Sequence, residues 1–320
     1  MPRTNDRRPE RWCRMAALLA AALTAGCGGA LPGLALDGPP EDGVRLARTL
    51  CASEAGRVNA VSTGRPERLA ALFVHGTPGR WRAFERYLAD PELTERLHLV
   101  SVDRLGWGAS RDPEGNDAVE PAFAVHSEAL GPLLEALDRA NGGAGVIVVG
   151  HSLGASLAPR LAADHPEEVA GLLLLAGSHD PELRARRWYN LLADLAPVRW
   201  MIAEDLRRSN DEIMALPREL EINATLWPEL DLPVVLVQGM DDPLVSPGHA
   251  DWVEAHAPAG AARVLRLEDT NHFVPWNRYE LIKGELLALA DRVDEGGDAA
   301  ADAGRIADAT EACTLGTAAR

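Results

Sequence analysis

The amino-acid sequence predicts a doubly wound α/β protein with a mostly parallel sheet and an inserted helical cap. Short apolar runs recur along the chain and alternate with segments of helical spacing, which is typical of parallel strands buried between layers of helices. Residues 178–230 interrupt this alternation with arginine-rich helical stretches and proline breaks, as a cap inserted between two strands would. Ligands of such sheets lie beyond the carboxyl ends of the strands, so we expect the functional site in the loops there.

The predicted strands are continuous runs of apolar residues bounded by glycine, proline or polar loops. They cover residues 69–74, 97–102, 146–149, 169–176, 233–238 and 263–267. Helical spacing follows at residues 81–89, 121–139, 153–163, 247–256 and 279–293. We expect the first of these helices to end at Asp90-Pro91 and the last to close the domain. Residues 46–61 should supply the first strands or a lead-in helix.

Length and charge limit the possible functions. A chain of 320 residues is long enough for one large α/β domain, and its 47% hydrophobic and 25% charged residues are those of an ordinary globular protein. The formal net charge of −16 argues against nucleic acid as a partner and against electrostatic docking on anionic lipid, because phosphate binding needs clustered cations.

The first 26 residues resemble an export signal. Five arginines precede an apolar run from Met15 to Leu23, which is too short to span a bilayer. Small residues then lead to Cys27, as in bacterial lipoprotein signals, although such signals usually have leucine where Thr24 stands. We therefore expect a signal peptide at residues 1–26. We expect the mature protein to be exported to the cell envelope and to attach to a membrane only through a lipid anchor on Cys27. The alternative is an ordinary secretory signal with an incidental cysteine.

Composition divides the rest of the chain into three segments. Residues 27–43 are rich in glycine, proline and acidic residues, which predicts a tether. Residues 44–293 form the predicted α/β domain, with the helical cap at about residues 178–230. Residues 294–320 are acidic and alanine-rich, so we expect a mostly disordered tail.

Two cysteines remain after the export signal has been accounted for. Cys13 would be removed with the signal and Cys27 would be acylated, which leaves Cys51 and Cys313. In an oxidising compartment such a pair is a plausible disulfide, which would tie the start of the domain to its tail. The alternative is two unpaired thiols.

One stretch carries the strongest chemical signal. Branched residues 146–149 run directly into Gly150-His151-Ser152-Leu153-Gly154, and a helical pattern follows. A G-x-S-x-G sequence between a strand and a helix is typical of a nucleophile elbow, a strained turn that exposes the serine hydroxyl. Glycine fits the flanking positions because the turn approaches neighbouring backbone closely. The alternative is a glycine-rich turn with an ordinary serine.

A serine hydroxyl needs a base to take its proton and an acid to orient that base. His272 lies in the loop after the last predicted strand, and Asp242 lies in the loop after the strand before it. This gives the chain order Ser, Asp, His that an elbow of this kind requires. Asp241 is the rival acid.

The chain resembles the capped α/β-hydrolases of the lipase and esterase kind over about residues 65–293. The resemblance rests on five loops in the same order, namely HGTPG, DRLGWGAS, GHSLG, GMDDPLV and TNHFVPW. It implies an α/β-hydrolase fold in which Ser152 is the nucleophile, His272 the general base and Asp242 its acid, because that family places the acid three residues after the glycine. It also implies an oxyanion hole formed by the backbone amides of Leu153 and Thr77.

The serine nucleophile implies acyl transfer, since relatives that open epoxides or displace halides use aspartate at the elbow. We therefore expect a monomeric serine esterase that cleaves small acyl substrates through an acyl-enzyme.

No cofactor or metal is expected, because the histidines lack the spacing of a zinc site and no phosphate-binding loop follows a strand. Two alternatives stay open. One is an amidase or aminopeptidase, in which Glu204 or Asp205 of the cap would meet a free amine. The other is a non-catalytic binding protein that uses the same pocket.

Overall fold

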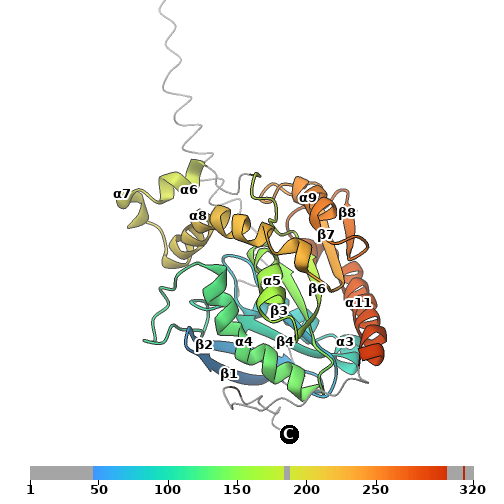
Figure 1. Ribbon diagram of the computed structural model, residues 1–320. Helices are drawn as coiled ribbons and strands as arrows, with labels where there is room; N and C mark the ends of the chain where they lie inside the picture. The colour runs from blue at the N-terminus through green and yellow to red at the C-terminus, as the bar shows by residue number, and fades with distance from the viewer. Residues whose placement is uncertain (1–45, 184–187, 301–312, 314–320) are drawn as a thin grey trace, which may run out of the picture.

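A computed structural model describes residues 46–183, 188–300 and 313 of the chain. Its centre is an eight-stranded sheet of order β1-β2-β4-β3-β5-β6-β7-β8 (Figure 1). Strand β2 runs antiparallel to its neighbours β1 and β4, and the other neighbouring strands pair in parallel. The predicted fold class is confirmed. The strands are β1 (Ala47–Ser53), β2 (Gly56–Thr63), β3 (Ala70–Val74), β4 (His98–Asp103), β5 (Val146–His151), β6 (Val169–Leu175), β7 (Val234–Gly239) and β8 (Ala262–Leu267).

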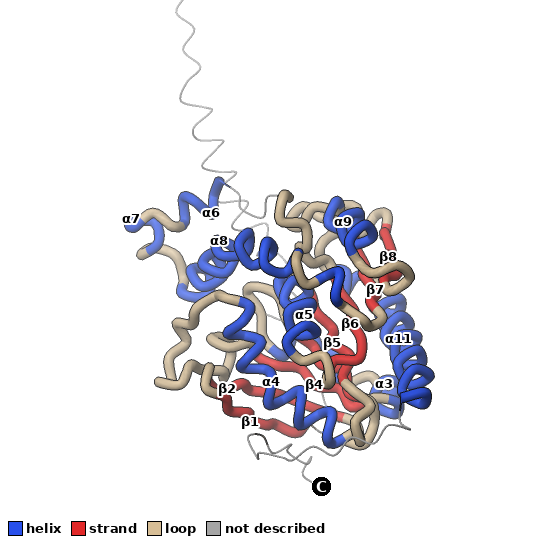
Figure 2. The backbone as a smooth tube through the Cα atoms, in the orientation of Figure 1, coloured by secondary structure: helices blue, strands red, loops and turns tan. Residues whose placement is uncertain are grey.

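Helices cover both faces of this sheet (Figure 2). One face packs against α4 (Phe123–Ala140), α5 (Leu153–Asp164) and α9 (Gly248–His256). The other packs against η1 (Trp81–Phe84), α2 (Glu85–Leu88), α3 (Pro91–Arg96), α10 (Val274–Asn277) and α11 (Tyr279–Ala300). Strand β5 shows why its sequence has no alternation of polar and apolar residues. Val146 and Val148 enter the first apolar cluster, whereas Ile147 and Val149 enter the second.

Residues 46–61 form the antiparallel strands β1 and β2, which is the first of the two alternatives expected for them. Two other elements differ from the sequence-based expectation. Helix α3 begins where a helix was expected only to end, because the Asp90 side chain accepts hydrogen bonds from the Glu92 and Leu93 amides at 2.9 and 3.1 Å, as a helix N-cap does. Helix α11 continues to Ala300, beyond the expected end at residue 293.

The cap helices lie between β6 and β7. They are α6 (Trp188–Ala193), α7 (Ala196–Arg199), α8 (Glu204–Ala224) and η2 (Trp227–Glu229). Figure 1 shows α6 and α7 projecting away from the sheet at one end of α8. Large apolar side chains in this projecting region are exposed, among them Leu191, Leu195, Trp200 and Met201.

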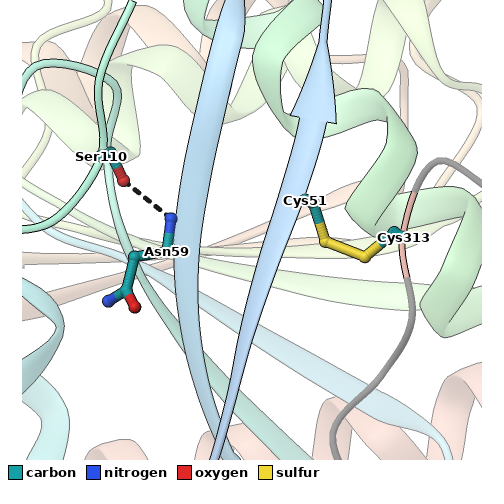
Figure 3. Close-up of a disulfide and its surroundings, with 4 residues drawn as sticks. All are labelled: Cys51, Asn59, Ser110 and Cys313. Atoms are coloured by element: carbon teal, nitrogen blue, oxygen red, sulfur yellow. Dashed lines mark hydrogen bonds between the residues drawn. A yellow bond between two sulfur atoms is a disulfide. The ribbon is translucent and has the colours of Figure 1, made fainter. Parts of the chain in front are cut away.

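A disulfide joins Cys51 of β1 to Cys313, with 4.6 Å between the two Cα atoms (Figure 3). The proposed signal peptide at residues 1–26, the lipidation site Cys27, the tether at residues 27–43 and most of the tail at residues 294–320 lie outside the described residues. Of the helices that the structure describes, none is long and apolar enough to cross a membrane.

Candidate active site

Ser152 occupies a sharp turn between the end of β5 and the start of α5. Its backbone has φ 55° and ψ −121°, a combination that is unfavourable for a residue with a side chain and that the surrounding structure must enforce. The Ser152 amide donates to Leu175 O of β6 at 2.9 Å, which holds the turn at the sheet edge. This strand-turn-helix arrangement is the one that a nucleophile elbow requires.

Glycines around this turn leave room for close backbone contacts. A Cβ atom at Gly150 would lie 2.5 Å from both Ala155 Cα and Gly154 O. A Cβ atom at Gly154 would overlap Val74 O at the end of β3, and one at Gly76 would lie 2.8 Å from Ser152 Cβ. Side chains at these positions would therefore push the turn away from the neighbouring strand end.

The structure brings Asp242 and His272 together. Asp242 Oδ2 lies 2.7 Å from His272 Nδ1, and both side chains are buried. Asp242 Oδ1 accepts hydrogen bonds from the Leu244 and Val245 amides, each at 2.8 Å. Burial alone would raise the pKa of the Asp242 carboxyl, but the hydrogen bonds from His272 and these amides hold that pKa below its ordinary value. The rival acid Asp241 is exposed and directs its backbone amide to Thr270 O.

A second histidine, His151, contacts the loop that carries His272. His151 Nε2 lies 3.0 Å from the backbone oxygen of His272, and the two ring centroids are 4.9 Å apart. Burial, together with the nearby His272, lowers the pKa of His151 to about 3, so this ring stays neutral and can donate to that oxygen. Ser152 is the next residue along the chain, and the contact therefore links the serine turn to the histidine loop.

Ser152 and His272 are brought onto neighbouring loops but are not hydrogen-bonded to each other. Within the part of the chain that the structure describes, the Ser152 hydroxyl has no hydrogen-bond partner. Such contacts between nucleophile and base are often loose until a substrate binds.

Thr77 and Leu153, the two predicted oxyanion-hole residues, lie close to the serine turn. Leu153 is the first residue of α5, where a helix leaves its amides unpaired, and Thr77 follows Gly76, the residue that packs against Ser152. Among the described residues, neither amide donates to a carbonyl or a side chain. Both amides are therefore free to donate to a bound ligand.

Sequence reasoning missed a buried ion pair beside this loop. Arg104 donates to Glu212 of α8 through Nη1 to Oε1 at 2.6 Å and through Nη2 to Oε2 at 3.1 Å. Burial alone would raise the pKa of Glu212, but the charge and hydrogen bonds of Arg104 hold it below its ordinary value. Trp107 Nε1 also donates to Glu212, at 3.0 Å. The only signal in the sequence was an arginine within the glycine-rich loop after β4.

The loop that carries Arg104 is fixed to the antiparallel part of the sheet. Ser110 Oγ accepts a hydrogen bond from the Asn59 amide of β2 at 2.8 Å (Figure 3) and donates to Asp103 O at 2.7 Å. Asp103 in turn accepts from the Trp81 and Ala109 amides at 2.8 and 2.9 Å. Hydrogen bonds of Asp103 and Ser110 therefore hold in place the loop from which Arg104 projects.

A solvent-open pocket of about 520 Å³ lies between the cap and this loop. Its walls include Leu105, Val119 and His126 from the sheet domain, and Trp200, Arg208 and Glu212 from the cap. Ser152 and His272 do not line it. No group of three or more metal-ligating side chains occurs among the described residues.

The two cap carboxylates considered for a free amine are both paired with arginine. Glu204 and Asp205 lie 3.3 and 3.5 Å from the Arg208 guanidinium, and Asp205 also lies 3.5 Å from that of Arg80. An amine would have to compete with these contacts.

Comparisons with known proteins agree with this architecture. A 1-acylglycerol-3-phosphate O-acyltransferase from Arabidopsis thaliana is 29% identical over 143 residues, which is 44% of this chain and 32% of that relative. The chain spans less than half the length of the curated relatives it matches.

Two solved structures are similar in fold. A membrane phospholipase A, described as a bacterial virulence factor, has a TM-score of 0.58 and 19% identity, covering 89% of this chain and 99% of that protein. A carboxylesterase from Bacillus subtilis has a TM-score of 0.57 and 14% identity, covering 77% and 92%. Residues 71–283 match the model of the alpha/beta hydrolase family. Because this match covers most of the chain, and because the eight-stranded sheet and the serine turn after β5 agree with it, the chain belongs to the alpha/beta hydrolase family.

Proposed function

We propose that this protein is a serine hydrolase that cleaves carboxylic esters through an acyl-enzyme intermediate. The observation that carries the proposal is the buried 2.7 Å contact between Asp242 and His272. Ser152 stands in a strained turn at the carboxyl end of β5, in the same sheet. Because Nδ1 of His272 is engaged by the carboxylate, Nε2 is the ring atom left to accept a proton. The family match supports a hydrolase, and the serine at the elbow favours acyl transfer.

The reaction proceeds in two balanced halves. Ser152 Oγ attacks the ester carbonyl carbon while His272 Nε2 takes the hydroxyl proton, and the Thr77 and Leu153 amides stabilise the oxyanion. The C–O bond to the alcohol breaks and His272 returns the proton to that alcohol. Water then attacks the acyl-enzyme by the same route, which releases the acid and restores Ser152. Asp242 keeps the imidazole in the productive tautomer and stabilises its protonated form.

Labelling with a fluorophosphonate tests the nucleophile. We expect the wild-type protein to be labelled and Ser152→Ala to lose labelling, while Ser246→Ala, a serine on the loop after β7, keeps it. Labelling of the Ser152→Ala variant would overturn the assignment. A panel of p-nitrophenyl esters beside aminoacyl anilides then tests the bond cleaved, and hydrolysis of anilides alone would replace the esterase with an amidase or aminopeptidase.

Transfer of the acyl group to an alcohol is a second candidate, favoured by the name of the Arabidopsis relative. The acyl-enzyme would be the same, and an acceptor hydroxyl would take the place of water. Adding lysophosphatidate to the ester assay distinguishes the two reactions, because transfer yields phosphatidate whereas hydrolysis yields only the free acid.

We further propose that the protein is exported and acts as a monomer on small acyl substrates, with Cys27 as its membrane anchor. The disulfide between Cys51 and Cys313 supports an oxidising compartment. Cys27→Ser should release the mature protein from the membrane fraction, and an unchanged distribution would contradict the anchor.

A further inference from the structure

We infer that Arg104 and Glu212 are positioning residues that fix the oxyanion-hole amide of Thr77 and couple it to the cap helix α8. This inference rests on the proposed function. It goes beyond that function by assigning to the cap a part in transition-state stabilisation.

The first step of the argument is the peptide unit between Gly76 and Thr77. Gly76 O and Thr77 N–H belong to one planar peptide group, in which they point in opposite directions. Arg104 Nη2 lies 2.9 Å from Gly76 O, and His75 Nδ1 lies 2.7 Å from the same oxygen. These contacts on the carbonyl side set the direction of the Thr77 N–H on the other side.

The tautomer of His75 agrees with this role. His75 Nε2 accepts a hydrogen bond from the Arg104 amide at 3.0 Å, so the ring proton is on Nδ1 and can be donated to Gly76 O. Burial and the charge of Arg104 lower the pKa of His75 well below its ordinary value, which keeps this neutral form in place. Arg104 Nε also donates to His75 O, at 2.9 Å. One guanidinium thus holds two successive carbonyls of the loop.

The second step is the cap. Glu212 holds the other edge of the same guanidinium with two hydrogen bonds, a geometry that only a planar fork supports. One turn earlier on α8, Ser209 Oγ lies 2.9 Å from Thr77 Oγ1. Residues three apart share a helix face. Helix α8 therefore meets the loop of residues 75–77, here called the oxyanion loop, at two neighbouring points. A shift of α8 would therefore reorient the peptide that carries the Thr77 amide.

The third step concerns why a buried ion pair stands here. Arg104 and Glu212 are 1% and 4% exposed. A buried pair is often no more stabilising than apolar residues of similar volume, because both charges lose their hydration. Its distinctive property is directional, bidentate geometry, which suits the placement of a loop.

Kinetics of Glu212→Gln test the inference. Glutamine keeps the size of the side chain but has one acceptor oxygen and no charge, so the fork loses one of its two bonds. We expect kcat to fall by about tenfold to a hundredfold with KM changed less than threefold, because a misdirected oxyanion donor affects the transition state more than the bound ester. Affinity for a trifluoromethyl ketone, which mimics the tetrahedral state, should fall by the same factor as kcat.

Asp211→Asn is the matched control on the same helix. Asp211 also makes a bidentate pair with an arginine, Arg199, at 2.6 and 2.8 Å, but this pair joins α7 to α8 and leaves the oxyanion loop untouched. We expect kcat of Asp211→Asn to stay within twofold of wild type. An equal loss in both variants would mean that any α8 carboxylate matters, and would overturn the inference.

A double variant addresses the case in which Glu212→Gln fails to fold. Arg104→Met with Glu212→Leu removes both charges, so no unpaired charge is left buried. We expect a stable protein whose kcat is at least tenfold reduced. Wild-type kcat in either folded variant would overturn the positioning role while the proposed function stood. A wild-type protein that hydrolysed no ester and took no fluorophosphonate label would overturn both.

Discussion

In the sheet, Leu173 of β6 is fully buried between helices, whereas Leu195 beside α7 in the cap is 55% exposed. The difference extends to how each region is held. The strands are joined by backbone hydrogen bonds and pack into two apolar clusters. The cap adds Leu216 and Leu220 to one cluster, but it contacts the loops near Ser152 through polar groups such as Glu212 and Ser209. Apolar burial stabilises the fold but does not fix the orientation of the groups in contact. Polar contacts fix that orientation but add little net stability.

Acid should produce the largest effect, and mainly through the sheet domain. Burial lowers the pKa of His98, His126 and His249 to about 4, and burial with the nearby His272 lowers that of His151 to about 3. The cap region at residues 178–230 contains a single histidine, His179, whose pKa burial likewise lowers well below its ordinary value. An unfolded histidine titrates near pH 6.5, so between about pH 4 and 6.5 the unfolded chain binds more protons than the folded protein. The free energy of unfolding therefore falls as the pH drops through this window, by up to about 1.4 kcal/mol per histidine per pH unit.

Urea denaturation at pH 7.5 and pH 5.0 measures this effect. We expect several kcal/mol of stability to be lost at pH 5.0 in total. Equal midpoints at the two pH values would show that these histidines are accessible to protons in the folded protein.

Leu173→Ala should produce the next largest effect. It removes a fully buried side chain from a central strand and leaves a cavity, which typically costs about 2–5 kcal/mol. The urea midpoint should fall while the m-value stays constant. A loss below about 1 kcal/mol would mean that the cluster around β6 can collapse onto the gap.

Leu195→Ala should produce the smallest effect. The side chain is more than half exposed, so its truncation should change the free energy of unfolding by less than about 0.5 kcal/mol in the same titration. A loss comparable to that of Leu173→Ala would show that this side chain is buried in solution, and the contrast between the two regions would then be wrong.

The same contrast explains what the sequence could predict. Strands buried on both faces leave unbroken apolar runs, so β5 and β6 were located to within a residue or two. The chemistry of strand-end loops follows chain order, which is why Asp242 and His272 could be named together. Helix α3 was missed because Asp90-Pro91 is equally typical of a helix end and a helix start.

Contacts of the cap follow different rules and were not predictable. Arg104 and Glu212 are 108 residues apart, and their pairing depends on how α8 lies across the loops. No periodicity encodes that placement. The exposed apolar residues of α6 and α7 likewise follow no pattern that separates them from buried ones. A pairing of this kind becomes visible only in three dimensions.

The link between Cys51 and Cys313 closes a covalent ring through the protein. Ser152, Asp242 and His272 all lie inside this ring, and so does the whole cap. A single peptide-bond cut in any surface loop of the ring would therefore leave one molecule with two new ends. The two pieces of a nicked molecule would stay joined through sulfur, and only a thiol reductant would separate them on a denaturing gel.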